Sequence, residues 1–200
     1  MQLTRRAHFY VLLVCAFGLS AFGYWVTRLR LVGVSREEVI ASLLFFVAIV
    51  VADLFATLIP AFRSDISAGV ALWIAAVVSL GPTLGILIVV AATLASELYI
   101  RVVDSDLKGR NPLFVAEVIS FNVTQVALSL SITAAYFFLL GVPTGYLATG
   151  LDFLKVVGGF FIFVFLNSSL VSGVVSLSTR QPIRYLVAEW FREFSVQYLV

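Results

Sequence analysis

The chain has little charge. Asp, Glu, Lys and Arg make up 12% of its 200 residues, whereas hydrophobic residues make up 62%. A water-soluble domain carries about 25% charged residues, because it must cover its core with a hydrated surface. The composition therefore excludes an ordinary soluble domain, and the mean hydropathy of +1.09 agrees with this. The exterior of the folded chain is expected to face lipid.

Cysteine and histidine occur once each. Cys15 has no second cysteine with which to form an internal disulfide, and His8 alone cannot form a histidine metal site. The sequence also lacks the HExxH, G-x-S-x-G, Walker and CxxC motifs. We therefore expect no cofactor, no metal and no enzyme activity in these residues. The net charge of +2 is too small to indicate nucleic-acid binding.

Long apolar runs predict an all-α polytopic transmembrane helical bundle over residues 1–180, with about six spans. A helix needs about 20 apolar residues to cross a bilayer, and charged residues or Gly and Pro separate the runs. The short third run ends at Gly81–Pro82, so the third and fourth runs form either a tight hairpin or a partly re-entrant pair. The predicted helices are residues 8–27, 39–62, 66–80, 82–102, 114–141 and 154–178.

The C-terminal residues show a different pattern. In residues 181–193, apolar residues recur at the helical spacing i, i+3, i+4, i+7 and i+8 among charged residues. This spacing predicts an amphipathic interfacial helix. Residues 194–200 are apolar again and are predicted to begin a further span. We therefore expect the chain to be the membrane part of a larger protein.

The basic residues predict an orientation. Nine of the 13 Lys and Arg residues fall on the side of the predicted spans that holds the N-terminus. Cytoplasmic loops of membrane proteins carry the excess of Lys and Arg. We therefore expect a multi-pass protein whose N-terminus is cytoplasmic.

Polar side chains inside the predicted spans are the main indication of function, because each costs free energy in lipid unless it is paired or hydrated. In the run 114–141, polar residues at i, i+3, i+7 and i+11 form one stripe on one helix face. The stripe consists of Asn122, Gln125, Ser129 and Thr133. The candidates for a polar interior that holds a small-molecule ligand are Asp53, Glu97, Asn122, Gln125 and Asn167.

Two interpretations of these candidates stay open. The residues either line a ligand cavity or only join helices, since one side-chain hydrogen bond between membrane helices contributes about 0.6 kcal/mol and at most ~2 kcal/mol. Glu97 has Arg101 four residues further on as a partner on the same helix. Asp53 lies deep in its run, where a carboxylate costs about 3 kcal/mol. Glu117 follows a predicted helix start, where the helix dipole favours a carboxylate.

Several short strings occur in the same order as in one known family and together span about residues 45–200. They are ADLF at 52–55, IS at 66–67, LGP at 80–82, SEL at 96–98, NPL at 111–113, FNVTQ at 121–125, LN at 166–167 and the amphipathic segment 180–200 with QYL at 197–199. In these strings the chain resembles the N-terminal membrane-integral domain of bacterial cyclic-di-GMP signalling proteins that carry HD-GYP or GGDEF output domains. Asp53 stands where that family has a glutamate.

The resemblance implies a sensory or anchoring domain in the bacterial inner membrane. Such a domain relays ligand binding or membrane state to a cytoplasmic output domain beyond residue 200. The candidate partners are the lipid bilayer, a small-molecule ligand and a second copy of the chain in a homodimer. One alternative is the substrate-binding subunit of an energy-coupling-factor vitamin transporter, which also has about six helices and a polar interior. A purely structural anchor is a third hypothesis.

Overall fold

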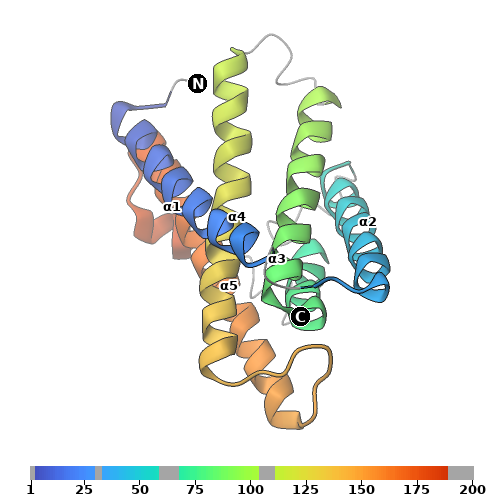
Figure 1. Cartoon of the computed structure of the whole chain (residues 1–200). Helices are drawn as coiled ribbons and strands as arrows, with labels where there is room; N and C mark the ends of the chain where they lie inside the picture. Colours follow the sequence, from blue (N-terminus) through green and yellow to red (C-terminus); the bar gives the residue numbers. More distant parts are fainter. Residues whose placement is uncertain (1–2, 30–32, 59–67, 104–110, 189–200) are drawn as a thin grey trace.

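The computed structural model describes residues 3–29, 33–58, 68–103 and 111–188. Every regular element in these ranges is an α-helix (Figure 1). Five of the helices are long and apolar enough to cross a membrane, which indicates a membrane protein. These helices are α1 (Arg5–Leu29), α2 (Arg36–Leu58), α3 (Ala68–Val103), α4 (Pro112–Leu139) and α5 (Gly150–Thr179).

The observed helix bounds differ from the predicted ones most in α3, which joins two predicted runs; α1, α2 and α5 start three or four residues earlier than predicted, and α4 is displaced by two residues at each end. The run predicted at 114–141 ends at Leu139, because Leu140 caps α4 and Gly141 has a positive φ of 63°. The last residues of the run predicted at 39–62 lie outside the described residues. The predicted helices 8–27 and 154–178 correspond to α1 and α5.

The predicted amphipathic helix is described only in its first half. Residues 183–188 are helical. The rest of the predicted helix 181–193, and the further span predicted to begin within 194–200, lie outside the described residues.

A sharp reversal divides α3 at Gly81. Gly81 has φ 79° and ψ 161°, outside the helical region, and Pro82 follows it and has no backbone N–H to donate. A Cβ added to Gly85 would lie 2.5 Å from the Cα of Val77. In a continuous helix these two positions would be about 12 Å apart. The chain therefore folds back on itself at Gly81.

The two arms of this hairpin, residues 68–80 and 82–103, have different lengths. At 1.5 Å per residue the first arm is about 20 Å long and the second about 33 Å. The hydrocarbon core of a bilayer is about 30 Å thick, so the described residues of the second arm are enough to cross it and those of the first arm are not. The two arms form a hairpin, which both arrangements predicted for this region contain. The predicted six runs thus correspond to five helices, one of which is divided at Gly81.

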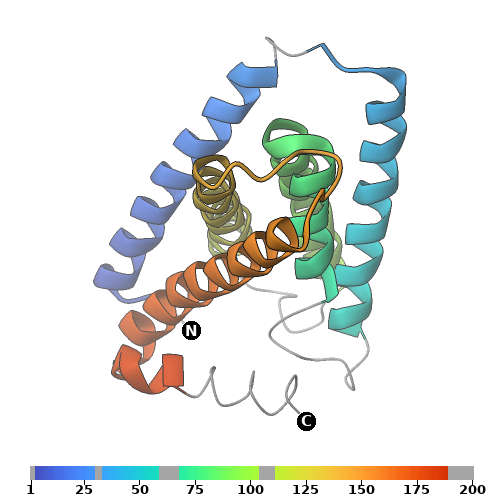
Figure 2. The same cartoon turned by 90° about the horizontal axis from the view of Figure 1, so that it is seen from below.

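α4 lies inside the bundle and contacts α1, α3 and α5, whereas α2 packs on α3 (Figure 2). Glycines allow close approach between helices, since Gly18 of α1 lies against Thr124 of α4 and Gly159 of α5 lies against Phe137 of α4. The starts of α1 and α4 meet the end of α5 at one end of the bundle, which we call the N-terminal end.

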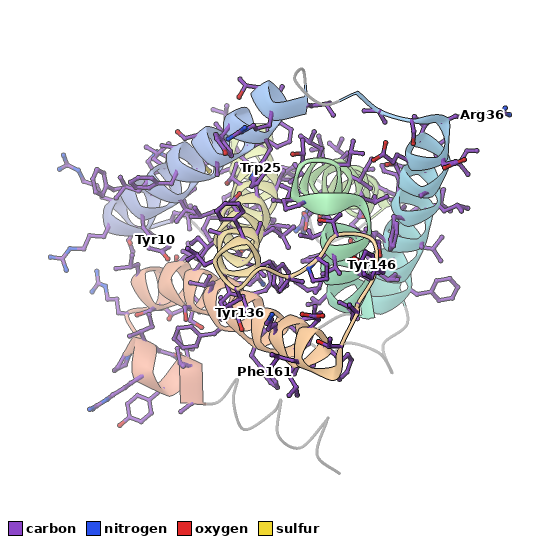
Figure 3. All side chains as sticks on the ribbon, turned by 60° about the horizontal axis from the view of Figure 1, so that its bottom comes forward. Tyr10, Trp25, Arg36, Tyr136, Tyr146 and Phe161 are labelled. Carbon is purple, nitrogen blue, oxygen red and sulfur yellow. The ribbon has the colours of Figure 1, made fainter. Side chains whose placement is uncertain are left out.

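The loop between α4 and α5 covers the turn of the α3 hairpin. The N–H of Gly145 donates to the carbonyl of Val78 at 2.9 Å, and the Cγ2 of Thr144 lies 3.2 Å from the position of a Cβ on Gly81. Figure 3 shows this loop, with Tyr146, lying across the same end of α3. The loop therefore shields the backbone where the helix is interrupted.

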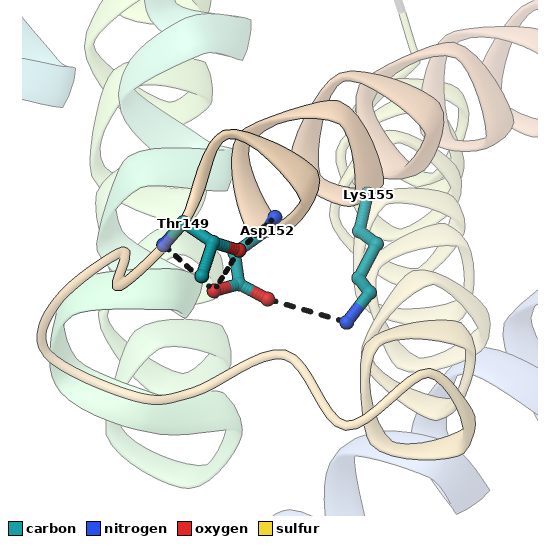
Figure 4. Close-up of polar contacts among 3 residues, drawn as sticks. All are labelled: Thr149, Asp152 and Lys155. Carbon is teal, nitrogen blue, oxygen red and sulfur yellow. Dashed lines mark hydrogen bonds and ion pairs between the residues drawn. The ribbon is translucent and has the colours of Figure 1, made fainter.

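α5 begins with a capping box (Figure 4). The N–H and hydroxyl of Thr149 donate to Oδ2 of Asp152 at 3.1 Å and 2.9 Å, and the N–H of Asp152 donates to Oγ1 of Thr149 at 3.2 Å. Lys155 Nζ also donates to Oδ1 of Asp152 at 3.2 Å. These bonds satisfy backbone donors that have no acceptor within the helix and fix the point where α5 starts.

Candidate functional site

A polar group joins α3 to α4. Glu97, on the second arm of α3, accepts hydrogen bonds on Oε2 from Nε and Nη2 of Arg101, at 3.2 Å and 2.9 Å. Its other oxygen, Oε1, accepts from Nδ2 of Asn122 on α4 at 2.9 Å. The side chains of Glu97 and Arg101 are 15% and 20% exposed. The carboxylate is thus bound by a cation on its own helix and by an amide on the neighbouring helix.

Further polar residues follow along the contact between the two helices. The second arm of α3 and α4 run side by side in opposite directions (Figure 1). Thr93, one turn before Glu97, therefore comes level with Gln125, about one turn after Asn122. Thr93 and Gln125 are each 6% exposed, and Ser129, one turn further along α4, is 0% exposed. We call Thr93, Glu97, Asn122, Gln125 and Ser129 the polar column.

Three atoms of the polar column have no hydrogen-bond partner among the described residues. They are Oγ1 of Thr93, Oε1 of Gln125 and Oγ of Ser129. Most buried polar atoms in proteins have a partner, and leaving one without a partner costs about 1–3 kcal/mol. The three atoms therefore retain unused hydrogen-bonding capacity inside the α3–α4 contact.

Three of the five residues predicted as candidates, Glu97, Asn122 and Gln125, lie in the polar column. Asp53 is partly buried on α2 and interacts with another residue. It takes no part in the hydrogen bonds that join Glu97 to Arg101 and Asn122.

Asn167 lies on the inward side of α5, one turn after Phe163. Phe163 is fully buried, and its ring meets that of Trp73 edge-on with centroids 5.6 Å apart. Oδ1 of Asn167 is buried and has no partner in the described part of the chain. No hydrogen bond links Asn167 to the polar column within the described ranges.

Several polar contacts between helices were not predicted, and two of them join the side chains of α1 to those of α4. Nδ1 of His8 on α1 lies 2.6 Å from Oε1 of Glu117 on α4, and Nε1 of Trp25 on α1 donates to Oγ of Ser131 on α4 at 2.9 Å. Glu117 was interpreted only as a carboxylate near a helix start. Trp25 and Ser131 are 106 residues apart, and no spacing within one helix indicates that they meet.

The following cavities lie elsewhere among the described residues, and the five predicted residues line none of them. An apolar cavity of about 540 Å³ lies between the first arm of α3, the α4–α5 loop and α5. A second, of about 1050 Å³, lies between α1 and α4 beside His8 and Glu117. The third, of about 700 Å³, is lined by Arg5, Arg6 and Arg180 at the N-terminal end. Within the described ranges, no three His, Cys, Asp or Glu side chains are grouped so that they could hold a metal ion.

Comparison with known proteins gives no relative. No protein-family model matches the sequence, no curated protein matches it, and no solved structure matches it. The function proposed for the chain therefore depends on its own residues, on their geometry and on the resemblance described in the sequence analysis.

Proposed function

We propose that the chain is the membrane-integral sensory domain of a bacterial signal-transduction protein and that the polar column is its sensing element. In this proposal the chain lies in the inner membrane with its N-terminus in the cytoplasm, and it relays its state to a cytoplasmic output domain of the cyclic-di-GMP type. The main support is the link between Glu97 and Asn122, which lies beside the buried amide oxygen of Gln125 that has no described partner.

The relay operates by population shift. A ligand can shift an equilibrium between two helix packings only by as much as it binds one of them better. A small polar molecule that donates a hydrogen bond to Gln125 and also bonds to Thr93 would favour the packing in which Thr93 and Gln125 lie opposite each other across the α3–α4 contact. Arg101 is one turn from Glu97, close to the end of α3. A displacement of α3 along α4 would therefore also move Arg101 and the end of α3 at the N-terminal end of the bundle, where the proposed orientation places the cytoplasm.

The test uses the full-length protein in its own membranes. The first step is to read the gene beyond Val200, where the proposal expects an HD-GYP or GGDEF domain. The second step is to measure basal turnover of cyclic-di-GMP for the wild type and for Asn122→Leu and Gln125→Leu. Ser20→Leu is the matched control, because Ser20 is exposed on α1 and bonds only to the carbonyl of Ala16 on its own helix.

We expect the two column variants to change turnover by about five-fold, the lower limit of ordinary coupling between sites, and Ser20→Leu to leave it unchanged. Wild-type turnover in both column variants would show that the column only joins helices. A reading frame that ends without an output domain, beside genes for transport ATPases, would instead support the vitamin-transporter alternative.

A further inference from the structure

A cavity lined by arginines lies at the N-terminal end of the bundle. Its volume is about 700 Å³, and its walls come from the start of α1, from the end of α5 and from the residues that follow α5. We call it the arginine cavity. Its lining includes Thr4, Arg5, Arg6, Ser176, Arg180 and Gln181.

Two short hydrogen bonds hold the walls of the arginine cavity in place. The hydroxyl of Thr4 donates to the carbonyl of Leu177 at 2.8 Å, which closes the start of α1 onto the end of α5. The hydroxyl of Ser176 donates to the carbonyl of Gln181 at 2.6 Å, which holds the turn after α5. The start of α1 and the end of α5 lie side by side in Figures 1 and 2. The fold therefore brings together arginines from opposite ends of the described chain.

The described part of the chain does not neutralise the charge of the arginine cavity. The guanidinium groups of Arg5, Arg6 and Arg180 form no ion pair or hydrogen bond with described residues, and no acidic side chain lines the cavity. Arg5 and Arg6 also begin α1, so their backbone N–H groups have no acceptor within the helix and lie at the positive end of its dipole. Guanidinium groups form bidentate hydrogen bonds to phosphate oxygens, so the arginines of the cavity and the start of α1 favour the binding of a phosphate.

The backbone of Arg180 has a conformation that is usual for glycine. Arg180 has φ 61° and ψ 21° at the C-cap of α5, and it is the one described non-glycine residue with a positive φ. Glycine is the common residue in a left-handed helix cap, because other residues lose free energy there. Arginine at this position therefore costs backbone free energy that glycine would not cost.

We propose that the arginine cavity binds the phosphate of an anionic phospholipid. The lipid-facing side of α1 continues from the cavity, since Phe9 follows Arg5 by one turn and Leu12 and Leu13 follow Phe9 by another. These three side chains are 63%, 54% and 42% exposed and form an apolar track on which acyl chains can lie. Basic pockets at helix ends on the membrane surface bind lipid headgroups in this way. This inference concerns residues outside the polar column and does not depend on the proposed function.

The test measures lipid binding to the purified chain in detergent by native mass spectrometry, with phosphatidylglycerol compared with phosphatidylcholine. The test variant is Arg5→Gln/Arg180→Gln. The control variant Arg28→Gln/Arg36→Gln removes the same charge at the opposite end of the bundle. Each basic residue near an anionic lipid contributes about 1 kcal/mol, and 1.4 kcal/mol is a factor of ten, so we expect phosphatidylglycerol to bind the test variant about 25-fold more weakly. The control is expected to bind like the wild type.

Arg180→Gly separates lipid binding from folding. Because glycine suits the positive φ, we expect this variant to melt at a higher temperature than the wild type while binding phosphatidylglycerol about five-fold more weakly. Equal weakening in the test and control double variants would overturn the proposal, since it would show only a long-range effect of charge. A second result would also overturn the proposal: the two lipids bind equally, and millimolar inorganic phosphate protects the wild type, but not the test variant, from thermal unfolding. This result would assign the cavity to a soluble phosphate compound.

Discussion

Removing Arg101 should destabilise the bundle more than removing its partner Glu97. In Arg101→Gln the Glu97 carboxylate, only 15% exposed, keeps its bond from Asn122 but loses its neighbouring cation. Breaking a fully buried ion pair in this way costs about 3–5 kcal/mol. Because this pair is partly exposed and one hydrogen bond is retained, we expect the free energy of unfolding to fall by about 2 kcal/mol.

The converse variant, Glu97→Gln, should cost about 1 kcal/mol. The amide oxygen that this substitution introduces can still accept from Asn122, and Arg101 near the end of α3 can extend its long side chain toward the membrane surface. The double variant Glu97→Gln/Arg101→Gln contains no unpaired charge, and its two introduced amides can bond to each other. It should therefore also cost about 1 kcal/mol, which corresponds to a coupling energy of about 2 kcal/mol between the two residues.

The free energy of unfolding of the wild type and the three variants can be measured in one detergent, with denaturant titrations followed by circular dichroism. The order of stability should be the wild type first, Glu97→Gln and the double variant next, and Arg101→Gln last. Additive costs, with the double variant losing about 3 kcal/mol, would refute the inference that the two charges are coupled inside the bundle.

Four further substitutions test the backbone arguments in the same unfolding assay. Gly85→Ala should destabilise the bundle by about 2 kcal/mol or more, because its Cβ would lie 2.5 Å from the Cα of Val77. In Gly23→Ala the added Cβ meets nothing within 4 Å, so this variant should stabilise α1 by about 0.5–1 kcal/mol. Gly81→Ala should cost about 1–3 kcal/mol, since its φ of 79° with ψ 161° is accessible mainly to glycine, and wild-type stability would contradict the hairpin turn. Arg180→Gly should add about 0.5–1 kcal/mol, and destabilisation would mean that its side chain supports the fold.

Features that depend on a single helix could be predicted from the sequence. The apolar runs place the helices, because a bilayer requires long stretches without charge. The spacing of Glu97 and Arg101 predicts their ion pair, because residues four apart lie on the same face of a helix. The turn at Gly81–Pro82 follows from the conformational range of glycine and from the missing N–H of proline.

Features that depend on how helices meet could not be predicted. Spacing shows that Asn122 and Gln125 share a face of α4, but it does not show that this face meets Glu97 on α3. For the same reason, Asp53 and Asn167 could not be distinguished from the residues of the polar column. The contact between the start of α1 and the end of α5 joins residues 173 apart in the sequence, and no local pattern records it.

Entry of the chain into a membrane during translation cannot proceed simply helix by helix. The last turn of the first arm of α3 leaves the carbonyl of Val78 without a hydrogen-bond donor when it leaves the ribosome, because Pro82, four residues further on, has no N–H. The N–H that bonds to this carbonyl belongs to Gly145, which is synthesised only after the whole of α4. Residues 68–80 must therefore be sheltered by the insertion machinery, or held at the membrane surface, until the α4–α5 loop has been made. A ribosome stalled before that loop should leave the hairpin accessible to water-soluble labels, and one stalled after it should not.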